Sequence, residues 1–239
     1  MQEVLNMIRK RQSARIPFDS ETPVAKEVLR QILEAGRWAP TAHNMQNFEI
    51  IIVDDKKVLG AIGRIKSTVS ETFIRENYQQ LSLSEEELLK KKVGILGTMF
   101  PLAWRTPGYK PDKDTNSGRP ILTGPVMLIV VYDPGRRAPA SEGDFLGIVS
   151  LGCVMENMWL MANSLGISFH VVSAIGAAPV EKEVKSILNI PDRLKIPFAF
   201  RLGYPVSKPA KYLRVRRGVE DFTHHNRFGN RYKDLGSDL

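Results

Sequence analysis

The longest apolar run of the chain lies at Asp144–Leu165, and as a helix it would carry apolar side chains on nearly every side. A membrane span needs roughly 20 apolar residues, whereas Ser150, Glu156 and Asn157 interrupt this run. We therefore predict a long central helix buried in the core of a soluble protein, with no membrane span. Burial on all sides needs packing partners on several sides, and a second copy of the chain is one candidate.

Four shorter apolar segments, rich in β-branched and aromatic residues, have the pattern of strands. They lie at Phe48–Val53, Pro125–Tyr132, Ser168–Ala174 and Lys195–Tyr204. The run at Pro125–Tyr132 is apolar throughout, which indicates a central strand covered on both faces.

Helical periodicity predicts amphipathic helices at Glu3–Arg11, from Thr22 to about Trp38, and after Pro179. Thr22 followed by a proline has the pattern of a helix start, with Thr22 as the N-cap. No repeat, low-complexity tract or linker divides the chain. The elements together predict one α+β domain over residues 1–239, with helices around a mixed central sheet.

The region between the first two predicted strands has a less regular pattern. Residues 56–100 read as helical and partly charged, and residues 101–119 are rich in proline, glycine and polar side chains. A stretch of the second kind is typical of a loop, here a candidate lid over a site. Trp104 and Tyr109 lie in this loop and either contact a substrate or hold the loop on the surface.

The net charge is +8, and much of it lies between Lys208 and Lys233, in a basic C-terminal arm at residues 208–239. Such a cluster indicates either a nucleic-acid surface or a site for a small phosphorylated ligand. Because the sequence has no zinc-finger or RNP pattern, we disfavour nucleic acid as the partner.

The single cysteine, Cys153, lies inside the predicted central helix. One cysteine excludes an intrachain disulfide and fits a reducing compartment. The first residues, MQEVLNMIRKRQS, lack the apolar core of a signal peptide. We therefore expect a cytoplasmic protein.

Several common catalytic motifs are absent from the sequence. No G-x-G-x-x-G follows a strand, and neither a P-loop nor a G-x-S-x-G elbow is present. A nicotinamide cofactor would therefore bind outside a Rossmann fold. The histidines His43, His170, His224 and His225 lack metal-ligand spacing, so no metal site is predicted.

The remaining candidates are polar motifs spread along the chain. Arg11–Arg15 combines two guanidinium groups with a hydroxyl, which suits an anion such as phosphate. The polar loop Ala39–Asn47 suits the edge of a planar heterocycle, and the turn Ser173–Gly176 and the pair Arg214 and Arg216 follow it in the chain. Taken singly, each has a plainer explanation, such as solvated charges after a helix or a polar turn before a strand.

In their order and spacing, these motifs resemble those of the FMN-dependent nitroreductase family. The family pattern is Arg-x-Ser-x-Arg/Lys, then Ala-Pro-Ser-x-x-Asn-x-Gln-Pro-Trp before a strand. The pattern continues with a buried helix, a glycine-containing turn and a strand that ends in Gly-Tyr-Pro. It closes with Lys/Arg-x-Arg and a following His. The matching segments span about two thirds of the chain and are Arg11–Arg15, Ala39–Phe48, Asp144–Gly166, Gly203–Pro205 and Arg214–His224.

The departures from the family pattern limit what the resemblance implies. Thr41 replaces the usual serine and keeps its hydroxyl, and Asn47-Phe48 replaces Pro-Trp and keeps an aromatic residue. Residues 61–119 fall outside the resemblance, as the variable lid or insert in which family members differ. The substrate is therefore not carried over.

The resemblance implies an obligate homodimer with two FMN sites at the subunit interface. By motif position, the phosphate would be held by Arg11, Arg214 and Arg216, with Ser13 and Gln12 nearby. Arg15 would lie against the flavin N1/O2 edge, where a fixed cation favours the negatively charged reduced flavin. The second subunit would contribute Pro40, Thr41, Asn44 and Gln46. The backbone near flavin N5 would come from Ser173, Ala174, Ile175 and Gly176.

The resulting hypothesis is an enzyme that passes a hydride from NAD(P)H through FMN to a small electron-poor acceptor such as a nitroaromatic or quinone, in ping-pong order. No catalytic acid or base is assigned, since FMN N5 is expected to react. One alternative is a specialised reaction of the family, either reductive dehalogenation or flavin fragmentation. Others are a basic nucleic-acid-binding protein and a protein that holds flavin without turnover.

Overall fold

The structure, a computed structural model, describes residues 2–14, 16–65, 124–207 and 216–231, together with Glu86 and Lys90. The chain divides into two compact units. The first consists of Met1–Thr68 and Lys113–Pro209, and the second of Val69–Asp112 and Ala210–Leu239. The elements that concern the predicted site lie almost entirely in the first unit.

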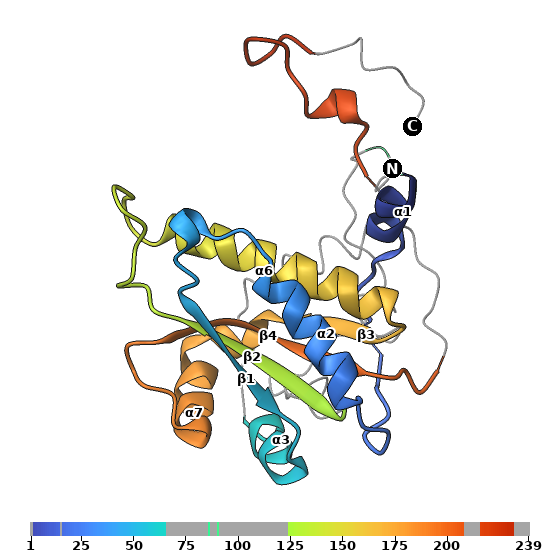
Figure 1. Cartoon of the computed structure of the whole chain (residues 1–239), viewed down its shortest axis with the longest axis vertical. Helices are drawn as coiled ribbons and strands as arrows, with labels where there is room; N and C mark the ends of the chain where they lie inside the picture. The colour runs from blue at the N-terminus through green and yellow to red at the C-terminus, as the bar shows by residue number, and fades with distance from the viewer. Residues whose placement is uncertain are drawn as a thin grey trace. The chain divides into compact units, whose positions relative to one another are not determined.

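A four-stranded sheet forms the centre of the first unit (Figure 1). Its strands are β1 (Phe48–Val53), β2 (Val126–Tyr132), β3 (Ser168–Val172) and β4 (Lys195–Gly203), in the order β1-β2-β4-β3. All four predicted strands are present, and the α+β class is confirmed. Every pair among the described strands is antiparallel, whereas a mixed sheet was expected.

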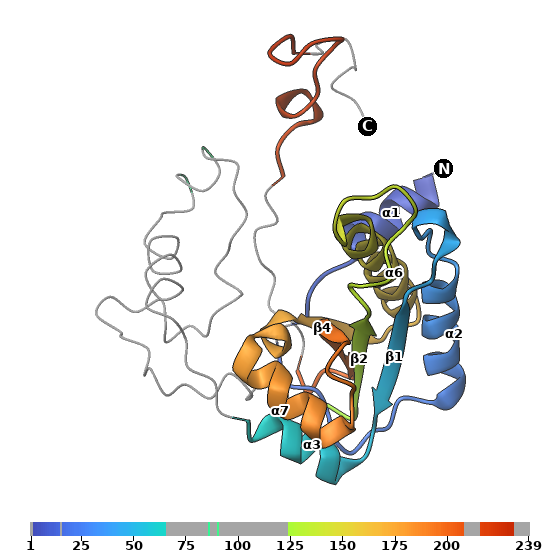
Figure 2. The same ribbon diagram turned by 90° about the vertical axis from the view of Figure 1, so that its left-hand side faces the viewer.

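Helices cover both faces of this sheet (Figure 2). On one face lie α2 (Lys26–Arg37) and α6 (Phe145–Ser164), with α1 (Gln2–Lys10) against α6. On the other lie α3 (Lys56–Gly63) and α7 (Ala178–Leu188). Strand β2 is buried along its whole length, as its apolar run predicted, because its side chains alternate between the two layers.

Helix α2 begins later than predicted. Its N-cap is Ala25 and not Thr22. The hydroxyl of Thr22 instead donates a hydrogen bond to Oδ2 of Asp19 at 2.5 Å, and the amide of Glu21 donates to Oδ1 of Asp19 at 2.9 Å. Asp19 therefore organises a turn at the place where the sequence pattern indicated a helix start.

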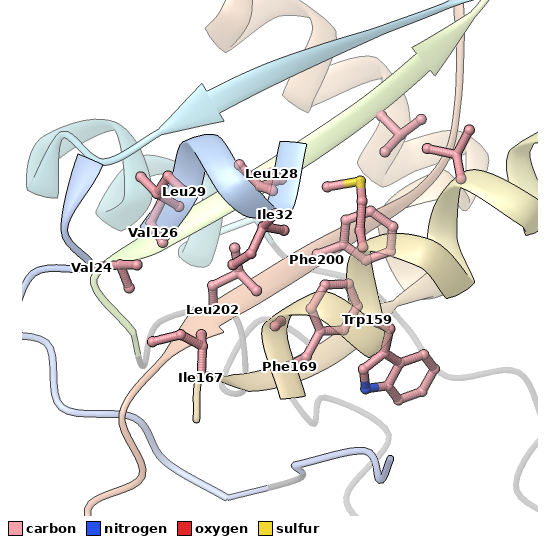
Figure 3. Close-up of a cluster of buried hydrophobic side chains, with 14 of the residues drawn as sticks. Val24, Leu29, Ile32, Val126, Leu128, Trp159, Ile167, Phe169, Phe200 and Leu202 are labelled. Carbon is pink, nitrogen blue, oxygen red and sulfur yellow. The ribbon is translucent and has the colours of Figure 1, made fainter. Parts of the chain in front are cut away.

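Three aromatic side chains pack together among aliphatic ones in the core layer between the sheet and α6 (Figure 3). Phe169 of β3 lies between two partners, with ring centroids 5.3 Å from Trp159 and 4.6 Å from Phe200. Gly36 of α2 lets this helix approach α6, since a Cβ atom there would lie 2.9 Å from the side chain of Met158. Close packing of this kind fixes the position of Trp159, which also touches the predicted site.

In a single chain, α6 is buried on one side only, which corrects the expectation of burial all round. Its buried residues are Ser150, Leu151, Val154, Met158, Trp159 and Ala162. On the opposite side Phe145 is 68% exposed and Val149 48% exposed, with Leu146 and Ile148 exposed beside them. Among the described helices, α6 is the one long and apolar enough to cross a membrane. We read it as a core helix because it packs against α2 and the sheet.

The described part of the second unit is a short basic segment with its own turns. A 3-10 helix, η4, spans Val219–Asp221. The imidazole of His224 stacks on Phe228 with ring centroids 4.5 Å apart, and its Nδ1 accepts a hydrogen bond from the amide of Gly229 at 2.9 Å. Arg231 pairs with His224 across the turn.

Candidate functional site

The first group of predicted residues follows α1 and is held by the second half of α6. The indole Nε1 of Trp159 donates a hydrogen bond to the backbone oxygen of Gln12 at 3.2 Å. The amide of Ala14 donates to the backbone oxygen of Phe169 at 3.0 Å, which joins the segment to β3. Core residues therefore fix the backbone on both sides of the half-buried Ser13.

The guanidinium group of Arg11 is oriented by two residues of α6. Its Nε lies 3.0 Å from Oε1 of Glu156, and its Cζ lies 4.2 Å from the ring centroid of Trp159. The indole face attracts the cation, and the carboxylate sets the direction of the planar fork. A positive group is thus held at the C-terminal half of α6, with a hydroxyl two residues away in the chain. This pair has the chemistry of a phosphate site.

The second group lies in the loop Pro40–Gln46, which joins α2 to β1 and contains the 3-10 helix η1 (Ala42–Asn44). The loop is attached to the first half of α6 (Figure 1). The amide of Ala42 donates to Oγ of Ser150 at 3.0 Å, and Ser150 Oγ donates to the backbone oxygen of Leu146 at 2.7 Å. One buried hydroxyl therefore connects the loop to the helix.

Within this loop, the predicted residues bond to one another. The amide of Gln46 donates to Oγ1 of Thr41 at 3.2 Å, and its Nε2 donates to Oδ1 of Asn44 at 3.0 Å. His43, Asn44 and Gln46 have φ angles of 50°, 53° and 46°. The left-handed region costs roughly 1–2 kcal/mol for most residues other than glycine and asparagine. Strained backbone of this kind clusters at functional sites, which favours a role for this loop in binding.

The third group is the turn Ser173–Gly176, the 3-10 helix η3 at the end of β3. Gly176 is required by packing, since a Cβ atom there would lie 2.6 Å from the backbone oxygen of Ile196 on β4. The amide of Ile196 donates to Oε1 of the buried Glu181 at 2.9 Å, and Lys185 Nζ lies 3.2 Å from the same oxygen. The first of these bonds ties α7, the helix after the turn, to β4, and Gly176 brings the turn itself close to β4. Ile175 is fully buried, whereas Ser173 and Ala174 are exposed, so these two residues form the part of the turn that a ligand can reach.

The structure does not bring the first two groups together within one chain. The first is anchored at Trp159 and the second at Ser150, nine positions apart on α6. At 1.5 Å per residue, these anchors lie about 14 Å apart along the helix axis. Each chain thus holds two separate groups of predicted site residues along one helix, and we call these groups the candidate half-sites.

Five predicted residues have a less direct outcome. Arg15, Trp104, Tyr109 and Arg214 lie outside the described residues, so their roles stay predictions. Arg216 is described as an exposed residue of the second unit, and its role also stays a prediction.

Sequence reasoning missed the residues that hold these segments in place. Ser150 and Trp159 lie in the apolar helix, where they read only as interruptions or as core. Arg201 of β4 is 2% exposed, and its Nη2 donates to the backbone oxygen of Ile16 at 3.0 Å. The sequence could have indicated this role, because Arg201 is a cation inside an apolar strand and buried charges need partners.

The described residues form no candidate metal site. There, no three His, Cys, Asp or Glu side chains come close enough together to hold a metal ion.

The chain matches one protein family over most of its length. A family model described as the nitroreductase family matches residues 8–204, a range that includes residues 61–119. The chain is 24% identical over 218 residues to an iodotyrosine deiodinase of Thermotoga neapolitana, covering 90% of this chain and 95% of that relative. It is 21% identical to an NADPH-dependent oxidoreductase of Staphylococcus aureus, over 95% of this chain and 74% of that one.

A solved structure of similar fold is a nitroreductase with bound FMN from Bacteroides fragilis. It has a TM-score of 0.59 and 21% identity, and the alignment covers 92% of this chain and 97% of that one.

Proposed function

Because the chain belongs to the nitroreductase family, we propose that it is an FMN-dependent enzyme that takes a hydride from NAD(P)H and passes it to an electron-poor acceptor. Family membership makes it an oxidoreductase. Nitroaromatics and quinones are the acceptor class that we propose. The NADPH-dependent oxidoreductase relative supports a nicotinamide as the electron donor.

The described residues fit FMN in their chemistry. Arg11 offers a cationic fork and Ser13 a hydroxyl on a backbone that Trp159 holds in place. That donor set suits a phosphate group. The loop Pro40–Gln46 offers short polar side chains for the edge of a flavin ring. The Bacteroides fragilis structure with bound FMN supports the same cofactor.

When bound, FMN supplies hydride acceptance and donation, and the protein supplies orientation and charge. The Arg11 side chain would bind the phosphate, and the Ser173–Gly176 turn would lie along the flavin. Gly176, pressed against β4, keeps this turn in one position. We assign the acceptor's proton to no side chain.

The observation that carries this proposal is the pair of candidate half-sites on α6. Within one chain they are about 14 Å apart along the helix. The exposed face of α6, which includes Phe145 and Val149, is apolar. A groove of about 700 Å³ lies between α1, α2 and α6, and its lining combines apolar residues such as Trp38 and Leu160 with polar ones such as Arg30 and Glu34. Exposed apolar surface of this extent marks an interface, and we therefore propose a homodimer in which each FMN lies between candidate half-sites of different copies.

One measurement tests whether the protein binds flavin and transfers a hydride through it. The purified protein should show the visible absorption of oxidised flavin, and anaerobic NADH or NADPH should bleach it. A nitroaromatic or quinone added afterwards should restore the absorption. A colourless monomer that does not retain added FMN would contradict the proposal, and a yellow protein that neither nicotinamide bleaches would leave flavin binding without this activity.

A second candidate reaction is reductive dehalogenation. It is favoured by the iodotyrosine deiodinase of Thermotoga neapolitana, which the chain matches over 95% of that relative's length. Anaerobic, dithionite-reduced enzyme mixed with iodotyrosine should then release iodide in step with flavin reoxidation. Reoxidation by nitroaromatics without iodide release would favour the first reaction.

A further inference from the structure

Arg201 is a cation in the buried part of β4. It lies opposite Met127 of β2 and His170 of β3, and it is 2% exposed. Its Nη2 donates to the backbone oxygen of Ile16 at 3.0 Å and contacts that of Ala14 at 3.4 Å. The guanidinium thus reaches out of the sheet to the segment that follows Arg11 and Ser13.

The surroundings hold Arg201 in this direction. Its Cζ lies 4.1 Å from the ring centroid of Phe18, and Nη2 lies 3.3 Å from Nδ1 of His170. Because a guanidinium only donates hydrogen bonds, Nδ1 of His170 acts as the acceptor. Gly124 lies beside the pair with a φ of 145°, a backbone angle that residues with side chains rarely adopt.

Three backbone oxygens of the segment are therefore anchored at alternate positions. Trp159 of α6 holds Gln12, and Arg201 of β4 holds Ala14 and Ile16. Ser13 comes between the first two anchors in the sequence. Arg15 comes between the last two; it lies outside the described residues, but both of its neighbours are described.

Burying the Arg201 cation in a strand costs free energy of desolvation. Burial lowers the pKa of Arg201 to about 10, so the group stays charged at neutral pH while it loses hydration. An apolar side chain of similar volume often costs less free energy at such a position. The cation has another use here, since it aligns carbonyl groups that no apolar side chain can bind.

We propose that Arg201 is a positioning residue, which holds the backbone at Ala14 and Ile16 so that the segment with Arg11 and Ser13 can bind the phosphate of FMN. The proposal rests on the proposed function, because it takes this segment as the phosphate site. Arg201 acts through the backbone and touches neither cofactor nor substrate in this role.

The test compares the dissociation constants of FMN and riboflavin, which differ by the phosphate alone. The ratio of the two constants is measured by flavin fluorescence titration for the wild type, Arg201→Met and Arg201→Lys. Val184→Ala is the matched control, because Val184 of α7 is fully buried in the core layer on the other face of the sheet. Thermal midpoints are recorded for these four proteins and for a fifth, Trp159→Phe.

Arg201→Met should reduce the preference for FMN over riboflavin by about tenfold or more, the effect of losing charge-assisted bonds. Arg201→Lys should restore part of it, since it keeps the charge but offers a single donor point. Val184→Ala should lower the thermal midpoint and keep the wild-type preference. Trp159→Phe, which removes the donor to Gln12 and keeps a ring, should reduce the preference as Arg201→Met does.

An unchanged preference in both Arg201→Met and Trp159→Phe overturns the proposal. An equal loss of preference in Val184→Ala also overturns it, since the effect would then follow stability alone. If Arg201→Met does not fold, Arg201→Lys and Trp159→Phe still decide. A wild type with no preference for FMN contradicts the proposed function itself, and this outcome is distinct from a failure of the variants.

Discussion

The hydroxyl of Ser150 accepts a hydrogen bond at 3.0 Å from the amide of Ala42, which lies 108 positions earlier in the chain. The same hydroxyl donates to the backbone oxygen of Leu146 one turn earlier in α6. It is the link between a strained polar loop and the helix beneath it. The conformation of the loop therefore depends on a residue outside the loop.

Ser150→Ala should leave the amide of Ala42 without this acceptor and loosen the loop. An unsatisfied buried donor costs about 1–3 kcal/mol of unfolding free energy, so we expect a loss in this range. FMN affinity should fall as well. Urea unfolding and FMN titration measure the two effects.

The control is Ser164→Ala at the other end of α6. Ser164 Oγ also donates to a backbone oxygen of its own helix, that of Met161 at 2.8 Å, but it is exposed. This variant should be nearly neutral in both measurements. If both variants lose stability and FMN affinity equally, the cause is a general change in α6 and not the loss of the bond between Ser150 and the loop.

Arg11 and Glu156 should have opposite effects on FMN binding. Arg11→Met removes the cation proposed to bind the phosphate, and a charge-assisted bond is worth about 1.5–3 kcal/mol, so affinity should fall roughly 10- to 100-fold. Glu156→Gln removes a carboxylate 3.0 Å from the same guanidinium, which competes with the phosphate for it, so affinity should rise. Flavin titration of both variants checks this. Equal losses of stability with unchanged affinity would show Arg11 to be a structural ion-pair partner.

Val149→Lys should separate the proposed dimer into monomers. Val149 is 48% exposed in one chain and lies on the apolar face of α6. A lysine there would bury a charge in the interface, at a large cost. Sedimentation velocity should give a dimer for the wild type and a monomer without bound FMN for the variant. Val206→Lys, at an exposed valine outside the helices, should stay dimeric.

Gly176→Ala should destabilise the protein by about 1–3 kcal/mol, the usual cost of forcing an atom into a packed site. The added Cβ would lie 2.6 Å from the backbone oxygen of Ile196, so the turn or β4 must move. Reduction of the flavin by NAD(P)H should slow. Gly60→Ala is the control, since its nearest atom is the flexible end of Arg64 at 3.3 Å, and a helical alanine gains about 0.5–1 kcal/mol.

Tyr132→Phe tests a pH-dependent contribution to stability. The hydroxyl of Tyr132 donates to Oδ2 of Asp144 at 2.7 Å, just before α6. Burial raises the pKa of Tyr132 above its ordinary value of 10.0, and the bond to Asp144 raises it further. The folded protein therefore keeps a proton that the unfolded chain loses above pH 10.

The stability that Tyr132 contributes is fully present below its unfolded pKa and declines as pH rises above it. At about pH 8, Tyr132→Phe should lower the unfolding free energy by about 2 kcal/mol, the value of a bond to a charged acceptor. At about pH 11 the difference between variant and wild type should be smaller. Urea unfolding at both values measures it, and a difference that does not shrink would contradict the assignment.

The strands of the sheet were predictable because their local composition is typical of strands. Runs such as Phe48–Val53 and Pro125–Tyr132 are apolar and β-branched, and they form β1 and β2 nearly as expected. The start of α2 was not predictable in this way, since Thr22 bonds to Asp19 and the helix begins at Lys26. Thr22 could have capped the helix or bonded to Asp19, and in the structure it bonds to Asp19.

Motif residues of the candidate site could be proposed from the sequence, whereas the residues that hold them in place could not. Arg11 and Thr41 stand out as polar residues in short motifs. Trp159 and Arg201 gain their roles only when α6 and β4 pack against the N-terminal segment. Nor does composition predict the left-handed backbone of Gln46, because such an angle is imposed by surrounding contacts.

The use of one helix for both anchors has a consequence for mixed assemblies. In a homodimer with shared pockets, the Ser150 end of one copy and the Trp159 end of the other would serve the same pocket. A subunit with a defect at the first end and a subunit with a defect at the second would together form one pocket with both defects and one with neither. Co-expression of two such inactive variants should then regenerate activity in up to half of the pockets of each hybrid.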